Sequence, residues 1–124
     1  MTTMIKDILL VGAGSFVGGA MRYAVSLMMR SCGGFPWATF TVNILGCLLI
    51  GALWGFTTRC TSITPHLNLF LGVGLCGGFT TFSTFSKESL ALLQQGNYSV
   101  FLLYAAGSVV MGLLAVALGL TLAK

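Results

Sequence analysis

The sequence predicts an all-α membrane protein with four transmembrane helices, the third of them broken. Of its 124 residues, 56% are hydrophobic and only 6% are charged, and the mean hydropathy is +0.99. A soluble domain carries about 25% charged residues, so most of this surface is expected to face lipid. At roughly 20 residues per span, four helices use nearly the whole chain, which we expect to be a single domain, residues 1–124.

Four apolar segments divide the chain, at about residues 8–29, 37–57, 67–94 and 98–122. The first is longer than the apolar core of a secretory signal peptide and is therefore predicted to be a span. Gly14 and Gly18 in the first segment, and Gly51 and Gly55 in the second, have the GxxxG spacing of closely packed membrane helices.

The third segment carries an unusual polar stretch. Residues 72–88 read GVGLCGGFTTFSTFSKE and place Gly77, Gly78 and a row of hydroxyl side chains between phenylalanines. In a bilayer, polar side chains and irregular backbone are tolerated only where protein or a water-filled path surrounds them. The sequence therefore predicts that the third span is broken here and lines a conduction path.

Polar side chains within the spans recur at helical spacing, and residues at this spacing share a helix face. The stripes are Thr39 with Asn43, Tyr104 with Ser108, and Thr80 with Ser83 and Thr84. Hydroxyl and amide groups donate hydrogen bonds without adding negative charge, and the two acidic residues, Asp7 and Glu88, lie near segment ends. Cation paths usually show acidic rings, whereas anion paths use donors and Arg. The pattern favours an anion, which Arg22 would draw towards a vestibule.

Each of these residues also has a simpler interpretation. Ser and Thr in membrane helices often bond to their own backbone. In the simpler interpretation, Asn43 only joins two helices by a hydrogen bond. Arg22 then only extends its long side chain to the membrane surface. For Phe82 and Phe85 the alternative is packing or lipid contact.

Basic residues are balanced between the two membrane sides. One side carries Lys6, Arg59 and Lys124, and the other has Arg22, Arg30 and Lys87 on it or nearest to it. Orientation follows the Lys and Arg bias, and here there is none. The sequence therefore predicts dual topology, with copies inserted both ways and paired antiparallel. Because four helices can scarcely enclose both a core and a pore, an oligomer is expected.

Catalytic and metal-binding patterns are missing from the sequence. The GxGxxG at residues 72–77 has no preceding strand, βαβ unit or acidic residue about 20 positions on. No CxxC pair occurs among the four cysteines, Cys32, Cys47, Cys60 and Cys76. Cys32 and Cys60 are expected at opposite membrane faces, too far apart for a disulfide within one subunit. The chain is predicted to be neither an enzyme nor a nucleic-acid-binding protein.

Three motifs carry a resemblance that covers all four spans. They are GAMRY at residues 19–23, TFTVNILG at 39–46 and GGFTTFSTFS at 77–86. With these motifs the chain resembles the Fluc (CrcB) family of bacterial fluoride channels.

The resemblance implies an antiparallel dual-topology homodimer with two fluoride pathways, set as a multi-pass protein in the bacterial inner membrane. Such a channel allows passive efflux of fluoride and so reduces its cytoplasmic toxicity. Its partners would be fluoride, a second copy and the lipid bilayer. It would also hold a structural, non-transported sodium ion at the dimer interface, bound by the backbone carbonyls of Gly77 and Thr80 from both subunits.

The resemblance also implies roles in the pathway. Phe82 and Phe85 would offer their ring edges, the positive part of the aromatic quadrupole, to fluoride. Arg22 would supply the vestibule charge. The hydrogen-bond donors would be Thr39, Asn43, Ser83, Thr84, Tyr104 and Ser108.

The alternative function is a small dual-topology multidrug or guanidinium exporter, which also has four short spans. Such exporters need a membrane-embedded Glu in the first span, where this chain has no acid beyond Asp7 at the edge. A structural or accessory membrane subunit would explain the GxxxG faces but not the polar stripes.

Overall fold

The computed structural model describes residues 2–29, 34–59 and 64–124, and every regular element in these ranges is helical. In chain order they are α1 (Thr2–Met28), α2 (Trp37–Arg59), α3 (Pro65–Asn68), the π-helix η1 (Leu69–Cys76), α4 (Gly77–Phe79), α5 (Ser83–Gln94) and α6 (Tyr98–Ala123). Four stretches are long and apolar enough to cross a membrane: α1, α2, Pro65–Gln94 and α6. The expectation of an all-helical chain with four long apolar segments is confirmed. Arg30, Cys32 and Cys60 lie outside the described residues.

The helix ends follow local sequence signals. Thr64 caps α3, because its Oγ1 accepts a hydrogen bond from the Leu67 N–H at 3.2 Å, and Pro65 occupies the first helical position. Between α5 and α6, Gly96 has a φ of +74°. Glycine reaches this left-handed conformation at no steric cost, so the chain turns back sharply there.

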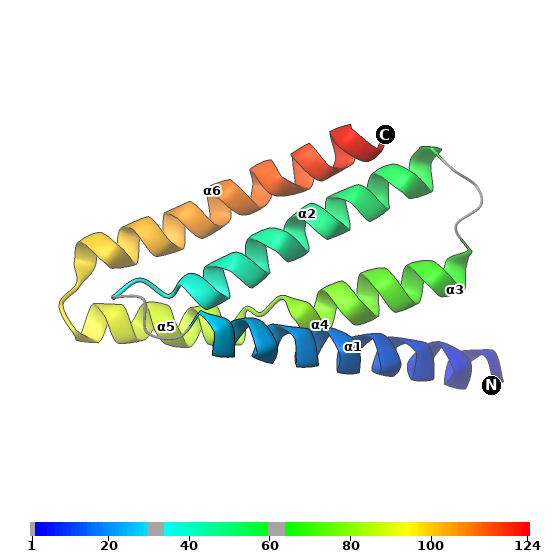
Figure 1. The fold of residues 1–124 in the computed structure, drawn as a ribbon, viewed down its shortest axis with the longest axis horizontal. Coiled ribbons are helices and arrows are strands. Elements are labelled where there is room, and N and C mark those ends of the chain that lie inside the picture. The colour runs from blue at the N-terminus through cyan, green and yellow to red at the C-terminus, as the bar shows by residue number, and fades with distance from the viewer. Residues whose placement is uncertain (1, 30–33, 60–63) are drawn as a thin grey trace.

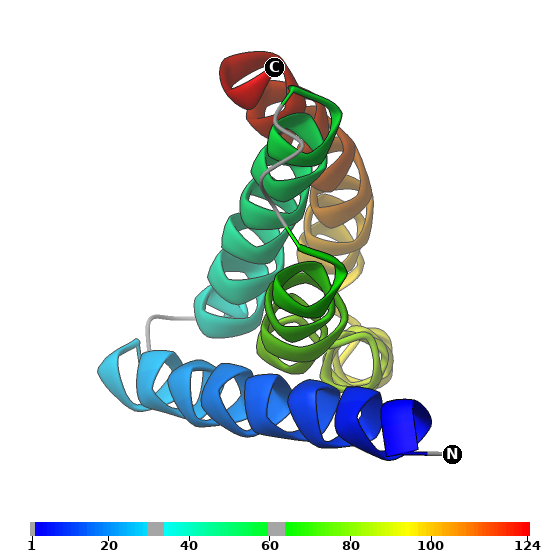
Figure 2. The ribbon, with the colours of Figure 1, turned by 90° about the vertical axis from the view of Figure 1, so that its right-hand side faces the viewer.

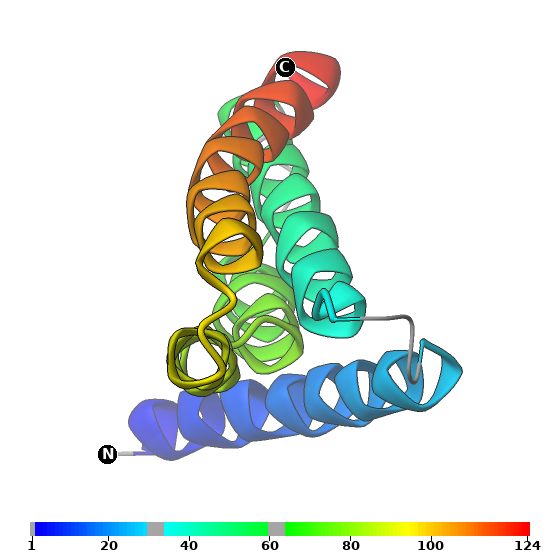
Figure 3. The same ribbon diagram turned by 90° about the vertical axis from the view of Figure 1, so that its left-hand side faces the viewer.

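The helices lie side by side in a broad, open arrangement (Figure 1). The order is α6, α2, the α3–η1–α4 segment and α1, with both termini at the same end. In the two views turned by 90° from the first, α1 runs along the bottom, steeply inclined to α2 and α6 (Figures 2 and 3). The most extensive packing joins α2 to α6, and α1 to η1 and α4. The packing of α2 against η1 is less extensive.

Few side chains of the single chain are enclosed. Val42 and Tyr104 are its largest fully buried side chains, while large apolar residues such as Phe16 and Met28 are 78% and 82% exposed. A soluble protein rarely exposes so much contiguous apolar surface. The outer faces therefore suit contact with lipid.

Glycines set the two closest helix crossings. Gly14 and Gly18 are the buried residues of α1, and a Cβ at these positions would collide with the carbonyl oxygens of Phe70 and Leu75 on η1. On α2, a Cβ at Gly51 would collide with the carbonyl oxygen of Val116 on α6. The prediction that the GxxxG pairs mark close packing is thus confirmed.

A matched pair of substitutions tests the α1 crossing. Gly18→Ala is expected to lower the free energy of unfolding by about 1–3 kcal/mol, because the added methyl must displace the backbone of η1. Gly12→Ala, on the same helix with nothing within 4 Å of the new Cβ, should be neutral or stabilise by roughly 0.5–1 kcal/mol through helix propensity. Thermal denaturation of the purified protein in detergent compares the two. Equal midpoints would show that the close crossing contributes nothing to stability.

Candidate functional site

The α-helix of the third apolar stretch stops at Phe79 and starts again at Ser83. Thr80 has φ −84° and ψ 160°, an extended conformation. Gly77 and Gly78, where the sequence led us to expect the irregular backbone, are themselves helical. The β-branched Thr80 and Thr81, whose side chains favour extended backbone, follow directly.

Two side chains from other helices bind the backbone groups that this geometry frees. Asn43 on α2 accepts a hydrogen bond from the Thr81 N–H at 2.8 Å and donates one to the Thr81 carbonyl at 3.1 Å. Arg22 on α1 donates through Nε to the Gly78 carbonyl at 3.2 Å. In an apolar setting an unpaired backbone group costs several kcal/mol. Asn43 and Arg22 therefore stabilise the non-helical residues.

The carbonyls of Gly77 and Thr80 lose their usual helical donors. In a continuous α-helix they would accept from the N–H groups of Thr81 and Thr84. Here the Thr81 N–H binds Asn43, and the Thr84 N–H donates to Thr81 Oγ1 at 3.2 Å. A Cβ on Gly77 would meet nothing within 4 Å, so the Cα of Gly77 faces open space.

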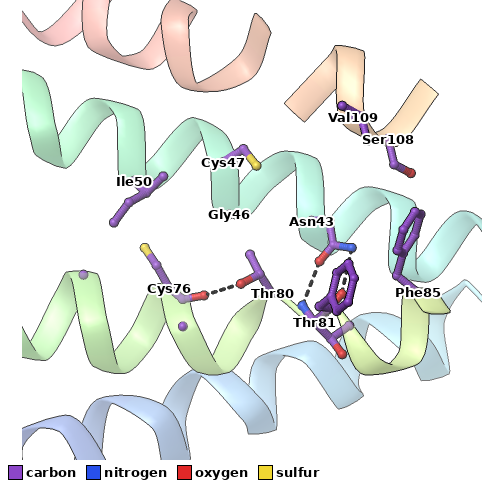
Figure 4. A pocket seen from close by; sticks show the side chains of 13 residues that line it. Asn43, Gly46, Cys47, Ile50, Cys76, Thr80, Thr81, Phe85, Ser108 and Val109 are labelled. Atoms are coloured by element: carbon purple, nitrogen blue, oxygen red, sulfur yellow. Dashed lines mark hydrogen bonds between the residues drawn. The ribbon is translucent and has the colours of Figure 1, made fainter. Parts of the chain in front are cut away.

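A cavity of about 450 Å³ lies beside these residues, between α2, the third span and α6 (Figure 4). It brings together six of the predicted site residues: Asn43, Gly77, Thr80, Phe82, Phe85 and Ser108. The Phe82 and Phe85 rings lie 6.0 Å apart between centroids, tilted by 41°. Ser108 Oγ is buried and has no hydrogen-bond partner among the described residues. A buried hydroxyl normally finds a partner, so this one is available to a ligand.

Other predicted residues face a different side of the non-helical residues. Arg22, Thr39, Thr81 and Thr84 line a cavity of about 170 Å³. Thr39 and Thr84 also line a larger one of about 590 Å³, which Glu88 borders. Since Thr81 lines both the first cavity and the second, the predicted residues form two groups that meet at the non-helical backbone.

Ser83 and Tyr104 are placed differently from these groups. The Ser83 hydroxyl is exposed and lies 3.4 Å from Thr81 Oγ1. Tyr104 is fully buried, and its hydroxyl donates to Glu88 Oε1 at 2.9 Å. The single hydroxyl proton of Tyr104 is therefore engaged by a carboxylate in this structure.

Comparison with known proteins identifies the family. Residues 9–120 match the family model described as CrcB-like protein, Camphor Resistance (CrcB). The chain belongs to the CrcB family. A fluoride-specific ion channel FluC of Phocaeicola vulgatus is 48% identical over 122 residues, which cover 97% of this chain and 100% of the relative.

Two further CrcB relatives carry the same name. Those of Chlorobium phaeobacteroides and Flavobacterium psychrophilum are 44% and 42% identical, covering 94% and 97% of this chain and 92% and 98% of their own lengths. These relatives are named as ion channels and not as enzymes. The resemblance drawn from the three motifs is confirmed.

Glu88 and Thr81 are site residues that the sequence analysis of this CrcB chain missed. The sequence placed Glu88 only near the end of a segment, yet Glu88 borders the cavity of about 590 Å³ and binds Tyr104. Its signal is the i, i+4 spacing from Thr84, which puts both on one face of α5. Thr81 contributes its backbone, which binds Asn43, and its hydroxyl, which accepts from the Thr84 N–H; the backbone contacts leave no side-chain pattern in the sequence.

Arg22 does more than reach the membrane surface, because its guanidinium binds the Gly78 carbonyl inside the protein. Arg22→Met keeps much of the apolar stem but leaves this carbonyl without its donor. We expect a loss of about 1–3 kcal/mol in the free energy of unfolding. Arg59→Met, at the exposed end of α2, serves as the control and should change little. Thermal denaturation in detergent measures both, and equal midpoints would mean that the Arg22 bond is not stabilising.

Proposed function

We propose that this chain is a fluoride-selective channel that lets fluoride leave the bacterial cell passively across the inner membrane and so reduces its cytoplasmic toxicity. The observation that carries the proposal is the near-complete match to relatives named fluoride-specific ion channels, with 48% identity over 97% of this chain. The polar groups gathered where the third span loses its helical hydrogen bonds support it. We take this point to be a break in the membrane-spanning helix.

The chemistry of these groups suits a small anion. Fluoride gives up water only where other donors replace it, and an amide nitrogen has two hydrogens. Asn43 uses one on the Thr81 carbonyl and keeps the other for the cavity that it lines. Ser108 Oγ is unpaired. Phe82 and Phe85 would present ring edges, and the Arg22 charge would attract the anion to the side where Thr39 and Thr84 lie.

The proposed assembly is an antiparallel homodimer of copies inserted in both orientations. Three basic residues on each side give no bias for one orientation. Phe82, which would line the path, is 78% exposed in the single chain and would be covered by a second copy. Tags on the C-terminus are expected to be reachable from both sides of the membrane.

We further propose that a structural sodium ion joins the two copies through the carbonyls of Gly77 and Thr80. Both residues line the same cavity, and both carbonyls have lost their helical donors to Asn43 and Thr81. Hard cations take oxygen ligands readily. The bound ion would supply positive charge at the interface without being transported.

Two substitutions separate carbonyl from side-chain ligation of sodium. Gly77→Val places an isopropyl group in the open space beside the Gly77 Cα, at the cavity that Gly77 lines. This bulk would crowd an ion at the carbonyl and is expected to abolish the extra thermal stability that sodium gives over an organic cation of equal concentration. Thr80→Val removes only the hydroxyl, which donates to the Cys76 carbonyl at 2.9 Å, and should retain that stabilisation. Loss of the sodium effect in both variants would indicate ligation by the Thr80 hydroxyl.

The proposed function is tested by ion efflux from liposomes that contain the purified protein. Vesicles loaded with fluoride or with chloride are diluted into salt-free medium, and a potassium ionophore balances the charge. We expect rapid fluoride efflux and no chloride efflux above that of protein-free vesicles. Equal rates for the two anions, or none for fluoride, would refute the proposal.

A further inference from the structure

The turn before α2 carries an aromatic side chain that reaches the neighbouring helix. The Trp37 N–H donates to the Phe35 carbonyl at 2.9 Å, and the Phe40 N–H donates to the Pro36 carbonyl at 3.1 Å, which ties the turn to the start of α2. The Phe35 ring lies 4.5 Å from that of Trp37 and 5.6 Å from that of Phe40, between centroids. Phe35 is therefore held in place by its own end of α2.

From this position Phe35 packs edge-on against Tyr104 of α6. The two ring centroids are 5.5 Å apart and the ring planes meet at 83°, the T-shaped geometry that aromatic pairs prefer. The Tyr104 ring lies in turn 5.0 Å from Phe85. Phe35, Tyr104, Phe85 and Phe82 thus form a continuous series of rings that leads from the turn to the non-helical backbone of the third span.

Tyr104 is the point at which this series meets the polar groups. It is fully buried, and its hydroxyl donates to Glu88 on α5. Phe35 and Glu88 border the same cavity of about 590 Å³. Loss of the Phe35 ring would leave one side of the Tyr104 ring unsupported next to that cavity, so both its hydroxyl and its contact with Phe85 would lose a fixed position.

We propose that Phe35 is a positioning residue for the fluoride path, acting through the Tyr104 ring on the Glu88 carboxylate and on Phe85. The inference rests on the proposed function. Phe40 offers a matched comparison, because it belongs to the same cluster and packs on Phe35 and Trp37 without being in the series of rings that reaches Phe85.

The first test compares fluoride efflux from liposomes for Phe35→Leu and Phe40→Leu, with size-exclusion profiles as the measure of folding. Phe35→Leu is expected to slow fluoride efflux by about tenfold, the factor that corresponds to the upper range of about 1.5 kcal/mol for one aromatic pair. Phe40→Leu should stay within about twofold of the unmodified protein. Phe35→Tyr keeps an aromatic ring at this position, so its efflux should stay close to that of the unmodified protein. Should Phe35→Leu not purify as a single species, Phe35→Met removes the ring with a flexible side chain that fits irregular gaps.

The second test asks whether Phe35 acts through Tyr104. Tyr104→Leu removes the ring that Phe35 contacts, together with the hydroxyl bound to Glu88, and its effect on efflux is measured alone and combined with Phe35→Leu. Because residues that act through one contact are not additive, the double variant should be little slower than Tyr104→Leu alone. If the efflux of the double variant fell by the product of the two single reductions, the inference would be overturned while the channel function stayed intact. Equal efflux for Phe35→Leu and Phe40→Leu would overturn it in the same way. No efflux from the unmodified protein would overturn both.

Discussion

Replacing Phe85 by Ile is expected to reduce fluoride efflux by about tenfold or more while the protein still assembles and purifies normally. The swap keeps bulk and apolarity, and near-volume swaps of this kind usually cost less than about 1.5 kcal/mol of stability. The ring itself lines the cavity of about 450 Å³ and lies between Phe82 and Tyr104. If ring edges replace part of the hydration of fluoride, loss of a contact to the charged ion raises the barrier by about 1.5–3 kcal/mol, or roughly tenfold to a hundredfold in rate.

Phe82→Ile should behave in the same way, and Phe16→Ile is its matched control. Phe16 on α1 is 78% exposed, as Phe82 is, but it lines none of the three cavities described above, so its replacement should leave efflux unchanged. Fluoride efflux and size-exclusion profiles are measured for all three variants. Near-normal efflux through both Phe82→Ile and Phe85→Ile would leave the two rings as packing residues and remove them from the mechanism.

Asn43→Ala is expected to abolish efflux and to destabilise the protein at the same time. The substitution deletes the amide that binds both the N–H and the carbonyl of Thr81. Each buried backbone group left unpaired costs about 1–3 kcal/mol, so the geometry around Thr80 would relax. Thermal denaturation in detergent and fluoride efflux from liposomes measure the two effects.

Cys47→Ala is the control for Asn43→Ala. Cys47 lies one turn further along α2 and lines the same cavity, and the substitution is likewise a shortening to Ala. Both stability and efflux should stay near those of the unmodified protein. If Asn43→Ala were as stable and as active as Cys47→Ala, the amide would be neither a stabilising contact nor part of the path.

The helical spans were predictable because apolar length and helical periodicity are local properties of the sequence. The observed helices extend past some of the apolar limits, since α1 begins at Thr2 and α2 ends at Arg59. Polar residues such as Lys6 and Thr58 lie outside the apolar segments but still within the helices. Hydropathy therefore marks the apolar part of each helix and not the helix ends. A close approach of α1 to another helix was predictable from the GxxxG spacing of Gly14 and Gly18, but its partner, the third span, was not.

The form of the third span was less accessible. A π-helix at Leu69–Cys76 is rare, and it lies where α1 packs closely on the segment, a tertiary contact whose partner no local pattern reveals. The extended conformation at Thr80 likewise depends on Asn43 and Arg22, which bind Thr81 and Gly78 from positions 38 and 56 residues away in sequence. Sequence patterns identify such residues as polar and inward-facing, but not which backbone groups they bind.

The division of the candidate site into two groups also required the structure. Thr39 and Asn43 share a helix stripe in the sequence, yet Asn43 borders the cavity with Phe82 and Phe85, and Thr39 borders the one with Arg22. Adjacent positions on a stripe lie about 6 Å apart along the helix axis, which is enough to reach opposite sides of the backbone at Thr81. Helical spacing fixes the face of a residue but not the partner that this face meets.

The central claim, passive and selective fluoride conduction, is tested most directly by the zero-current potential of the reconstituted protein in a planar bilayer. A fluoride gradient is imposed across the membrane, and a chloride gradient is added in the opposite direction. We predict a current whose zero-current potential follows the fluoride gradient and does not move when chloride is added. A potential that follows chloride, or the lack of any current while fluoride efflux from liposomes continues, would contradict the account.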